Sequence, residues 1–237
     1  MSDLLAGATT FLSQQDTEPL IRWIWISDHV DEIVSRGLQH VYLTIVTVVI
    51  GFLIAFPAAV YASRHRWAVS PITSISGVLY TIPAFAFIFL LLPITGLSLT
   101  TVVVPLIAYS LLILFRNTLA GLDSVEPEVK EAAIGMGLSR RQLLWRVEVP
   151  LAMPVIIAGL RIATVSSIGL ITIAALIGRG GFGQFILDGL NTFFWTPLLV
   201  GVVLSVALAF AADLLLLGLQ RLVTPWARAS GVRAVAT

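Results

Sequence analysis

The sequence has no cysteine among its 237 residues, so disulfide bridges, thiolate metal sites and cysteine nucleophiles are excluded. Charged residues are also scarce, at 11% of the chain, and there are only three histidines. These histidines (His29, His40 and His65) are too scattered to predict a cluster of metal ligands. The composition therefore indicates no cofactor and no nucleic-acid partner.

Apolar residues make up 58% of the chain, which is more apolar surface than one soluble core could bury. Such a composition is typical of an integral membrane protein. The length suits one bundle of about five spans of roughly 20 to 25 residues each, and it leaves no room for a nucleotide-binding domain. The sequence predicts an all-α, polytopic membrane protein.

Five apolar runs are long enough to cross a bilayer, at residues 38–62, 71–92, 99–120, 151–177 and 197–219. These runs divide the chain into an external N-terminal segment (1–37), a transmembrane domain (38–222) and a cytoplasmic C-terminal tail (223–237). Residues 123–150, which we call the polar hairpin, carry charges of both signs between the third and fourth runs. The folding of a membrane bundle does not require such a polar interruption. We therefore interpret residues 123–150 as a docking surface for a partner in the aqueous phase.

Charge asymmetry between the connections predicts the orientation, because short cytoplasmic loops gather Lys and Arg. The N-terminal segment is acidic, whereas the connections after the first, third and fifth runs are basic. We therefore expect the N-terminus outside and both the polar hairpin and the C-terminus in the cytoplasm. The basic residues are Arg64, Arg66, Arg116, Lys130, Arg140, Arg141, Arg146, Arg221, Arg228 and Arg233.

Residues 20–36 combine acidic side chains with Trp23 and Trp25. This pattern predicts a short amphipathic helix at the outer membrane interface, where tryptophan is enriched. The alternative is a frayed polar tail.

The polar hairpin contains signals for two helices. Pro127 suits the first turn of a helix, and Gly135 or Gly137 offers a left-handed stop. Ser139 and Gln142 have the spacing of a capping box, which predicts a second helix ending at Pro150. On the first helix, one face would hold Val125, Val129, Ala132, Ala133 and Met136, leaving Glu126, Lys130 and Glu131 toward water or a partner. The alternative is a solvated loop that only connects two spans.

Glu131-Ala132-Ala133 is followed after three residues by Gly137, and after nine more by Val147-x-Val149-Pro150. This spacing resembles the EAA signature of permease subunits of bacterial ATP-binding-cassette (ABC) importers, with Val147 and Val149 where Ile and Leu are usual. Further matches resemble the osmoprotectant branch, which imports glycine betaine, carnitine and choline. They lie at 82–83, 115–118, 148–154, 159–163, 177–183 and 224–226.

The resemblance implies the type I ABC importer permease fold in the inner membrane. It also implies two cytoplasmic ATP-binding subunits, a second permease subunit and an external substrate-binding protein, so this chain would hydrolyse nothing itself. The ATPase-contacting residues carried over from the signature are Glu131, Ala132, Ala133, Gly137, Ser139 and Pro150.

Arg161 and Asp213 are the ionisable residues deep in the fourth and fifth runs, where a lone charge is unfavourable. At about 1.5 Å per residue, Arg161 lies roughly 15 Å beyond Pro150 and Asp213 roughly 12 Å before Arg221. These similar depths allow an ion pair. The alternative is that each faces a water-filled cavity or reaches the interface separately.

Aromatic residues around Pro83 are candidates for the solute pathway, because quaternary ammonium groups bind aromatic faces. Tyr80 and Phe85 are the main candidates, and lipid-facing aromatics are the alternative. Pro83 itself is expected to kink the second span. The glycine-rich residues 178–183 lack a βαβ context, so they predict a sharp external turn that leads into a short helix rather than a dinucleotide site.

Two other functions compete with osmoprotectant import. One is an ABC permease for a different small solute, such as an amino acid. The other is an ion-coupled carrier or membrane enzyme, which should show inverted repeats, further intramembrane carboxylates or clustered catalytic groups. The sequence shows none of these features.

Overall fold

The computed structural model describes residues 19–226, so residues 1–18 of the predicted external segment and most of the predicted C-terminal tail lie outside it. Between these residues every regular element is helical. In chain order the elements are α2 (Trp23–Asp28), α3 (Val30–Arg64), η1 (Arg66–Ala68), α4 (Val69–Thr81), α5 (Ala84–Thr95), α6 (Leu99–Asp123), α7 (Pro127–Gly135), α8 (Arg140–Leu143), η2 (Leu144–Glu148), α9 (Val149–Ile171), η3 (Thr172–Ile177), α10 (Gly183–Thr192) and α11 (Trp195–Val223).

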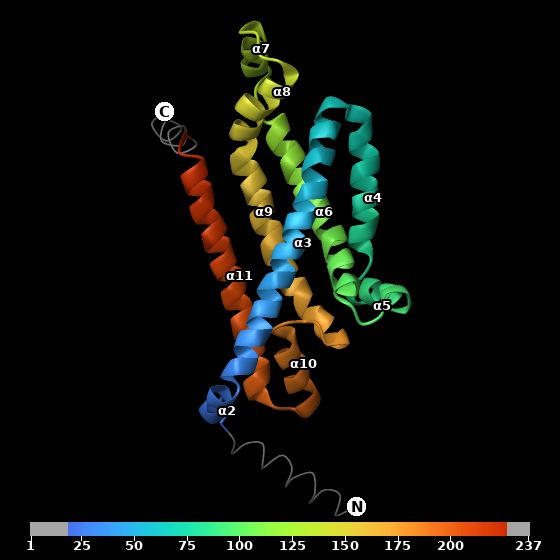
Figure 1. Cartoon of the computed structure of the whole chain (residues 1–237), viewed down its shortest axis with the longest axis vertical. Coiled ribbons are helices and arrows are strands. Elements are labelled where there is room, and N and C mark those ends of the chain that lie inside the picture. Colours follow the sequence, from blue (N-terminus) through green and yellow to red (C-terminus); the bar gives the residue numbers. More distant parts are fainter. Residues whose placement is uncertain (1–18, 227–237) are drawn as a thin grey trace, which may run out of the picture.

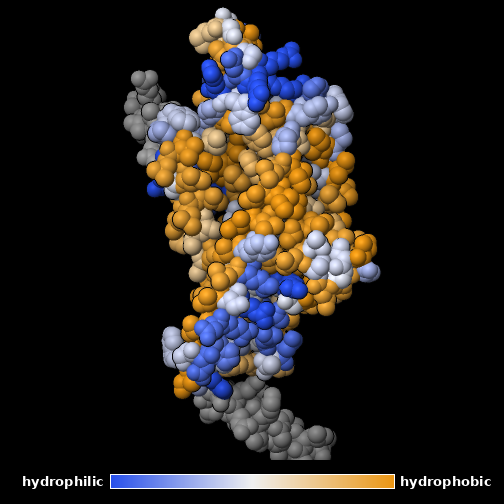
Figure 2. Space-filling model, in the orientation of Figure 1, coloured by the Kyte–Doolittle hydropathy of each residue, from blue (hydrophilic) through white to orange (hydrophobic). Residues whose placement is uncertain are grey.

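The long helices α3, α6, α9 and α11 run along the long axis of the molecule (Figure 1). Within the described residues, four helical stretches are long and apolar enough to cross a membrane, or five if one bent pair counts as a span. Helices α7 and α8 protrude beyond one end, which we call the hairpin end, while α2 and α10 lie at the opposite end. Figure 2 shows a hydrophobic band across the middle with hydrophilic residues toward both ends. This distribution matches the predicted polytopic bundle.

The second span is not the single continuous helix predicted over 71–92. Helices α4 and α5 meet at an angle of 91°, because Ile82 and Pro83 both adopt extended backbone. Proline lacks an amide proton and disfavours helical geometry at the residue before it. At about 1.5 Å per residue, neither the 13 residues of α4 nor the 12 of α5 could cross a hydrocarbon core alone.

Small residues allow α3 and α6 to pack closely. Gly51, Ala55, Ala59 and Ala62 are all buried and recur every three or four residues along one face of α3. A side chain at Gly51 would overlap Ser110 of α6. Close backbone approach of this kind is how helices associate in lipid, where the hydrophobic effect gives little attraction between them.

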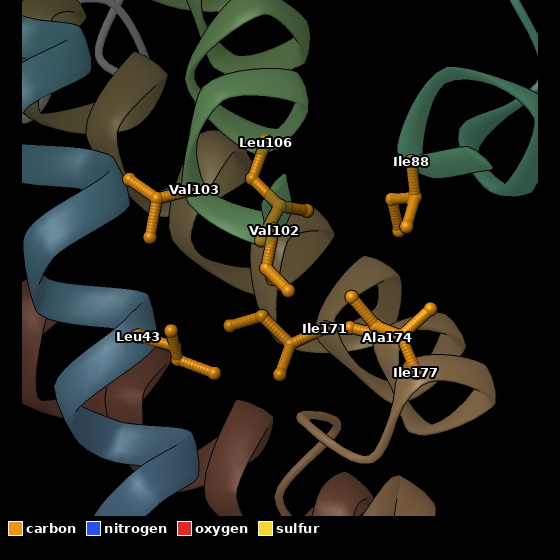
Figure 3. Packing of buried hydrophobic residues seen from close by; sticks show 8 residues of the cluster. All are labelled: Leu43, Ile88, Val102, Val103, Leu106, Ile171, Ala174 and Ile177. Atoms are coloured by element: carbon orange, nitrogen blue, oxygen red, sulfur yellow. The ribbon is translucent and has the colours of Figure 1, made fainter. Parts of the chain in front are cut away.

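Larger apolar residues fill the core toward the opposite end. Leu43 of α3, Ile88 of α5, Val102 of α6 and Ile171 of α9 belong to one buried cluster. Their side chains point toward one another from separate elements (Figure 3). This cluster packs the bent second span against the rest of the bundle.

The N-terminal helix is shorter than predicted. Instead of one interfacial helix over 20–36, α2 spans only six residues and α3 already begins at Val30. Trp25 stacks on His29 with ring centroids 4.2 Å apart, and it forms T-shaped contacts with the rings of Phe185 and Phe194. These aromatic contacts hold α2 against α10 and α11.

The glycine-rich turn ends in a short helix, as the sequence predicts, because α10 begins at Gly183. Gly178 and Gly181 have positive φ angles of 75° and 54°. A side chain at Gly181 would meet the ring of His40. The His40 ring is buried and accepts a hydrogen bond from the Phe182 amide at 3.3 Å, so its other nitrogen donates to the Ile168 carbonyl at 3.0 Å. His40 therefore ties α3 to α9 and to the start of α10.

Candidate functional site: the polar hairpin

Helix α7 begins and ends where local signals place it. Pro127 occupies the first turn, and Gly137 follows the helix with a φ of 85°. The Gly137 amide donates to the Ile134 carbonyl at 2.8 Å, and the Leu138 amide donates to the Ala133 carbonyl at 3.2 Å. This pair of bonds is a Schellman motif, so the predicted glycine turn is confirmed and its left-handed residue is Gly137.

The predicted capping box is also confirmed. The Gln142 amide donates to Ser139 Oγ at 3.4 Å, and the Ser139 amide donates to Gln142 Oε1 at 2.8 Å. These bonds satisfy two amides that the start of α8 leaves without helical partners.

Pro150 does not end the second helix, contrary to the prediction. A π-helical turn, η2, joins α8 to α9, and the helical stretch continues from Arg140 to Ile177. In this turn the Val149 amide donates to the Leu144 carbonyl, five residues back. Pro150 follows directly, at the start of α9, where its missing amide proton is tolerated. The polar hairpin is therefore continuous with the fourth span.

The predicted apolar face of α7 is only partly buried. Val125 and Ala133 pack inside, whereas Val129, Ala132 and Met136 are exposed, Met136 at 76%. The nine residues of α7 have little of the bundle to pack against, so the rest of the predicted apolar face stays exposed. Glu131, Gly137 and Ser139 are exposed as well, and Pro150 is half-buried.

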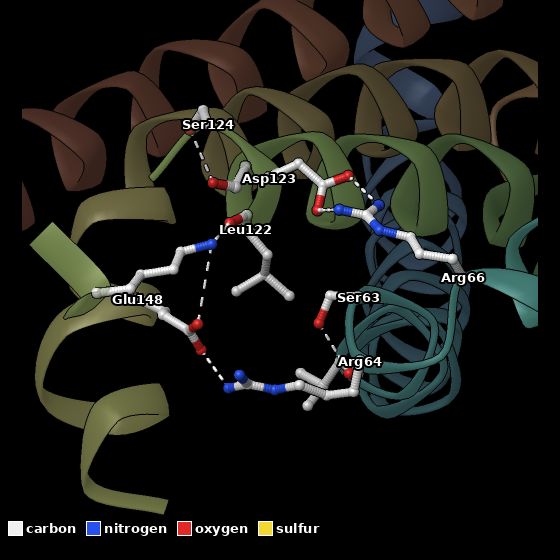
Figure 4. A network of polar contacts seen from close by, with 10 residues as sticks. Ser63, Arg64, Arg66, Leu122, Asp123, Ser124 and Glu148 are labelled. Atoms are coloured by element: carbon white, nitrogen blue, oxygen red, sulfur yellow. Dashed lines mark hydrogen bonds and ion pairs between the residues drawn. The ribbon is translucent and has the colours of Figure 1, made fainter. Parts of the chain in front are cut away.

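A buried carboxylate lies at the base of the hairpin. Glu148 of η2 is 4% exposed and pairs with Arg64 at the end of α3 (Figure 4). Lys130 Nζ of α7 lies 3.9 Å from Glu148 Oε1 and also donates to the Leu122 carbonyl of α6 at 3.2 Å. One side chain thus contacts groups from two other helices, and a third helix joins through Lys130.

A second ion pair lies close by on the surface. Arg66 donates to both carboxylate oxygens of Asp123, at 2.7 and 2.9 Å. The Arg66 side chain is 65% exposed. Neither cluster was predicted from the sequence, in which Arg64 and Arg66 indicate only the orientation. Lys130, predicted to face water or a partner, instead turns toward Glu148 and is 28% exposed. The available signal was the presence of opposite charges at the ends of neighbouring spans.

Arg161 and Asp213 form an ion pair, which is one of the two arrangements that the sequence left open. Arg161 donates through Nε to Asp213 Oδ1 at 2.8 Å and through Nη2 to Asp213 Oδ2 at 2.7 Å. About two helical turns further along the same pair of helices, Gln220 Nε2 donates to the Pro154 carbonyl at 3.2 Å. These contacts hold α11 against α9 in antiparallel register.

The candidate pathway residues gather at the break in the second span. Tyr80 is 45% exposed and Phe85 is 54% exposed. The ring of Tyr80 meets the edge of Tyr109 at 5.6 Å, and the Tyr109 hydroxyl donates to the Ile82 carbonyl beside Pro83. The hydroxyl replaces a helical donor that the break removes.

Residues 47–228 match the family described as "Binding-protein-dependent transport system inner membrane component". The chain belongs to this family. It is accordingly a membrane-embedded transport subunit, not an enzyme, and it works with ATP-binding subunits and a substrate-binding protein.

Two characterised relatives resemble the chain over most of its length. The osmoprotectant import permease protein OsmW of Salmonella typhimurium is 35% identical over 206 residues, which cover 85% of this chain and 96% of the relative. The glycine betaine/carnitine/choline transport system permease protein OpuCB of Bacillus subtilis is 32% identical over 194 residues, covering 82% and 89%.

Two solved transporters share the fold. The MetNI methionine ABC transporter, in an inward-facing conformation, aligns with a TM-score of 0.70 at 21% identity, covering 81% of this chain and 96% of the solved chain. An amino acid ABC transporter solved with histidines aligns with a TM-score of 0.69 at 19% identity, covering 85% and 98%. At these identities the likeness establishes the type I ABC importer permease fold and carries no argument about the solute.

Proposed function

We propose that this chain is the permease subunit through which an osmoprotectant with a quaternary ammonium group, such as glycine betaine, carnitine or choline, crosses the membrane. The relatives named for these solutes support the proposal, since they are 32 to 35% identical over about four-fifths of the chain. The external binding protein would make most of the choice among these solutes.

The observation that carries the coupling role is the exposed surface of the polar hairpin. Val129, Ile134 and Met136 are exposed apolar residues on a helix that lies outside the hydrophobic band. Beside them, Glu131 and Ala132 are exposed too. An apolar patch with a polar rim is typical of a protein-binding surface. We assign it to a cytoplasmic ATP-binding subunit, with Glu131, Ala132, Gly137 and Ser139 in contact.

The orientation follows from that assignment. The hairpin end and the C-terminus would face the cytoplasm, and α10 would face the external binding protein. A second permease subunit, identical or similar, would cover the apolar face of α9 that this chain leaves open, which includes Leu151, Ile162 and Val165. Solute would then pass between the two subunits near Tyr80, Pro83 and Phe85.

Co-purification with the ATPase tests the coupling surface. We expect Glu131→Lys to weaken ATPase binding, because it reverses a charge within the contact surface. Asp188→Lys, an equal charge reversal on the exposed part of α10 at the opposite end, serves as the matched control and should leave ATPase binding intact. Unchanged ATPase binding and unchanged transport in Glu131→Lys would refute the assignment of this surface to the ATP-binding subunit.

Reconstitution tests the solute. Vesicles containing the permease, the ATPase and the binding protein should take up labelled glycine betaine, carnitine or choline when ATP is supplied. Methionine and histidine serve as control solutes. Uptake of either amino acid, without uptake of any of the three quaternary ammonium solutes, would refute the osmoprotectant proposal.

Labelling of single cysteines tests the orientation without background, because the chain has no cysteine of its own. A membrane-impermeant maleimide should label Asp188→Cys in intact cells and Glu131→Cys only after the cells are opened. The reverse pattern would contradict the proposed orientation.

A further inference from the structure

Glu148 holds a position in the hairpin that the coupling role above does not use. Its carboxylate is buried, yet it contacts cations from two other helices, Arg64 at the end of α3 and Lys130 on α7. Lys130 in turn donates to the Leu122 carbonyl near the end of α6. Glu148, together with Lys130, therefore joins α7 to the two preceding spans α3 and α6.

The π-helical turn sets the direction in which Glu148 points. Each residue of an α-helix advances the side-chain direction by about 100°, and a π turn inserts one extra residue into the helical repeat. The bond from the Val149 amide to the Leu144 carbonyl places this insertion within Leu144–Glu148, so Glu148 is the last residue of the π turn. In a regular helix continuing α8, the Glu148 carboxylate would point away from Arg64 by roughly that angle.

Burial makes the cluster resistant to hinge motion. If α7 moved away from α3, Glu148 would lose a cationic partner while staying out of water, and an uncompensated buried charge is strongly destabilising. The neighbouring pair of Arg66 and Asp123 lacks this property, because Arg66 is 65% exposed and water can replace either partner. The two clusters therefore lie at the same end of the bundle, but only the loss of the Glu148 cluster would leave a charge buried without a partner.

From this geometry we infer that Glu148 is a positioning residue that fastens the polar hairpin to α3 and α6, so that the hairpin and the spans move as one body. The inference rests on the proposed function, in which an ATPase pushes on the hairpin. Without the fastening, ATP-driven movement of α7 would be absorbed at the hairpin rather than passed to the pathway. Glu148 then governs how much solute moves per ATP, not whether the ATPase binds.

Glu148→Gln tests the inference in the reconstituted transporter. It keeps the side-chain volume and one acceptor but removes the charge. We expect ATPase co-purification and ATP hydrolysis to stay near wild type while solute moved per ATP falls several-fold, because part of each ATP-driven movement of α7 would then be absorbed at the hairpin. Asp123→Asn, which removes the exposed pair at the same end, is the matched control and should leave the ratio within about twofold.

A distance measurement gives a second readout that does not depend on solute identity. Because the native chain lacks cysteine, spin labels can be placed at Tyr61→Cys on α3 and Glu128→Cys on α7, both exposed. In the full-length permease, Glu148→Gln should broaden the distance distribution between the labels, whereas Asp123→Asn should not. If Glu148→Gln fails to fold, Arg64→Gln removes one partner and leaves Lys130 on the carboxylate. It should still broaden the distribution relative to the wild type and to Asp123→Asn, and an unchanged distribution would overturn the positioning role.

The outcomes separate the two proposals. An unchanged solute-to-ATP ratio together with an unchanged distance distribution in Glu148→Gln overturns the positioning role. Equal effects of Glu148→Gln and Asp123→Asn also overturn it, because they would show that the total charge at the hairpin end matters and not the position of Glu148. Failure of the wild-type chain to bind an ATPase refutes the proposed coupling instead, and the distance measurement still decides whether Glu148 fastens the hairpin.

Discussion

Ser139 and Pro150 illustrate which details of the hairpin can be inferred from sequence. The capping box at Ser139 and the turn at Gly137 depend on bonds within a few residues, so local patterns predict them. Pro150 signals a helix end by the same local logic, yet the helix continues through it. The π turn that makes this possible places Glu148 against Arg64, which lies 84 residues earlier, and no local pattern contains that contact.

The similar depths of Arg161 and Asp213 made an ion pair possible from the sequence, but they did not decide between a pair and two separate positions. Both side chains are less than a third exposed, so Asp213→Ala should leave the Arg161 charge poorly compensated. We expect this change to destabilise the protein, seen as a lower unfolding temperature by tryptophan fluorescence.

Gln220→Ala is the matched control for this pair, since it removes a neutral hydrogen bond between the same two helices. Loss of this hydrogen bond should cost about 1 kcal/mol, and we expect the unfolding temperature to fall less than in Asp213→Ala. A charge-swapped double variant, Arg161→Asp with Asp213→Arg, should recover part of the stability. Absence of any recovery would show that the two side chains act separately.

Among the elements, the contact between α6 and α9 depends on glycine. A side chain at Gly159 of α9 would overlap Asn117 of α6, and one at Gly121 of α6 would press on the Ala152 carbonyl at 3.0 Å. Asn117 cannot easily turn away, because its side-chain amide donates to the Ile113 carbonyl at 2.8 Å. The two helices therefore approach more closely than any other residue would allow at these positions.

Gly159→Ala should accordingly destabilise the bundle by about 1 to 3 kcal/mol through overpacking. Gly218→Ala on α11 is the control, because nothing lies within 4 Å of the added carbon and alanine favours helix over glycine. Thermal unfolding of the two purified variants gives the comparison. Equal stability would mean that α6 and α9 separate without penalty.

The second span shows where prediction of elements fails. Its hydrophobicity correctly placed apolar helix over most of 71–92, and Pro83 correctly marked a distortion. The size of the bend was not predictable, because the Ile82 carbonyl is satisfied by the Tyr109 hydroxyl from α6. A donor supplied by another helix turns a kink into a right-angled break.

For the molecule as a whole, hydropathy sufficed to predict the class, since 58% apolar residues can be accommodated only in a bilayer. The resemblance of the hairpin signature then supplied the fold, and the family match bears it out. What remained hidden is how the parts are fastened, through His40 at the opposite end and Glu148 at the hairpin end. Both ties join residues distant in sequence, so only the assembled bundle reveals them.

Helix α3 carries both ties. With 35 residues it is about 52 Å long, whereas the hydrocarbon core is about 30 Å thick. Such a rod cannot fit by shortening, so it must tilt or extend beyond the lipid. Because α3 holds the start of α10 through His40 and the polar hairpin through Arg64, we expect a change in that tilt to shift both, so that a thinner or thicker bilayer would move the two ends of the subunit together.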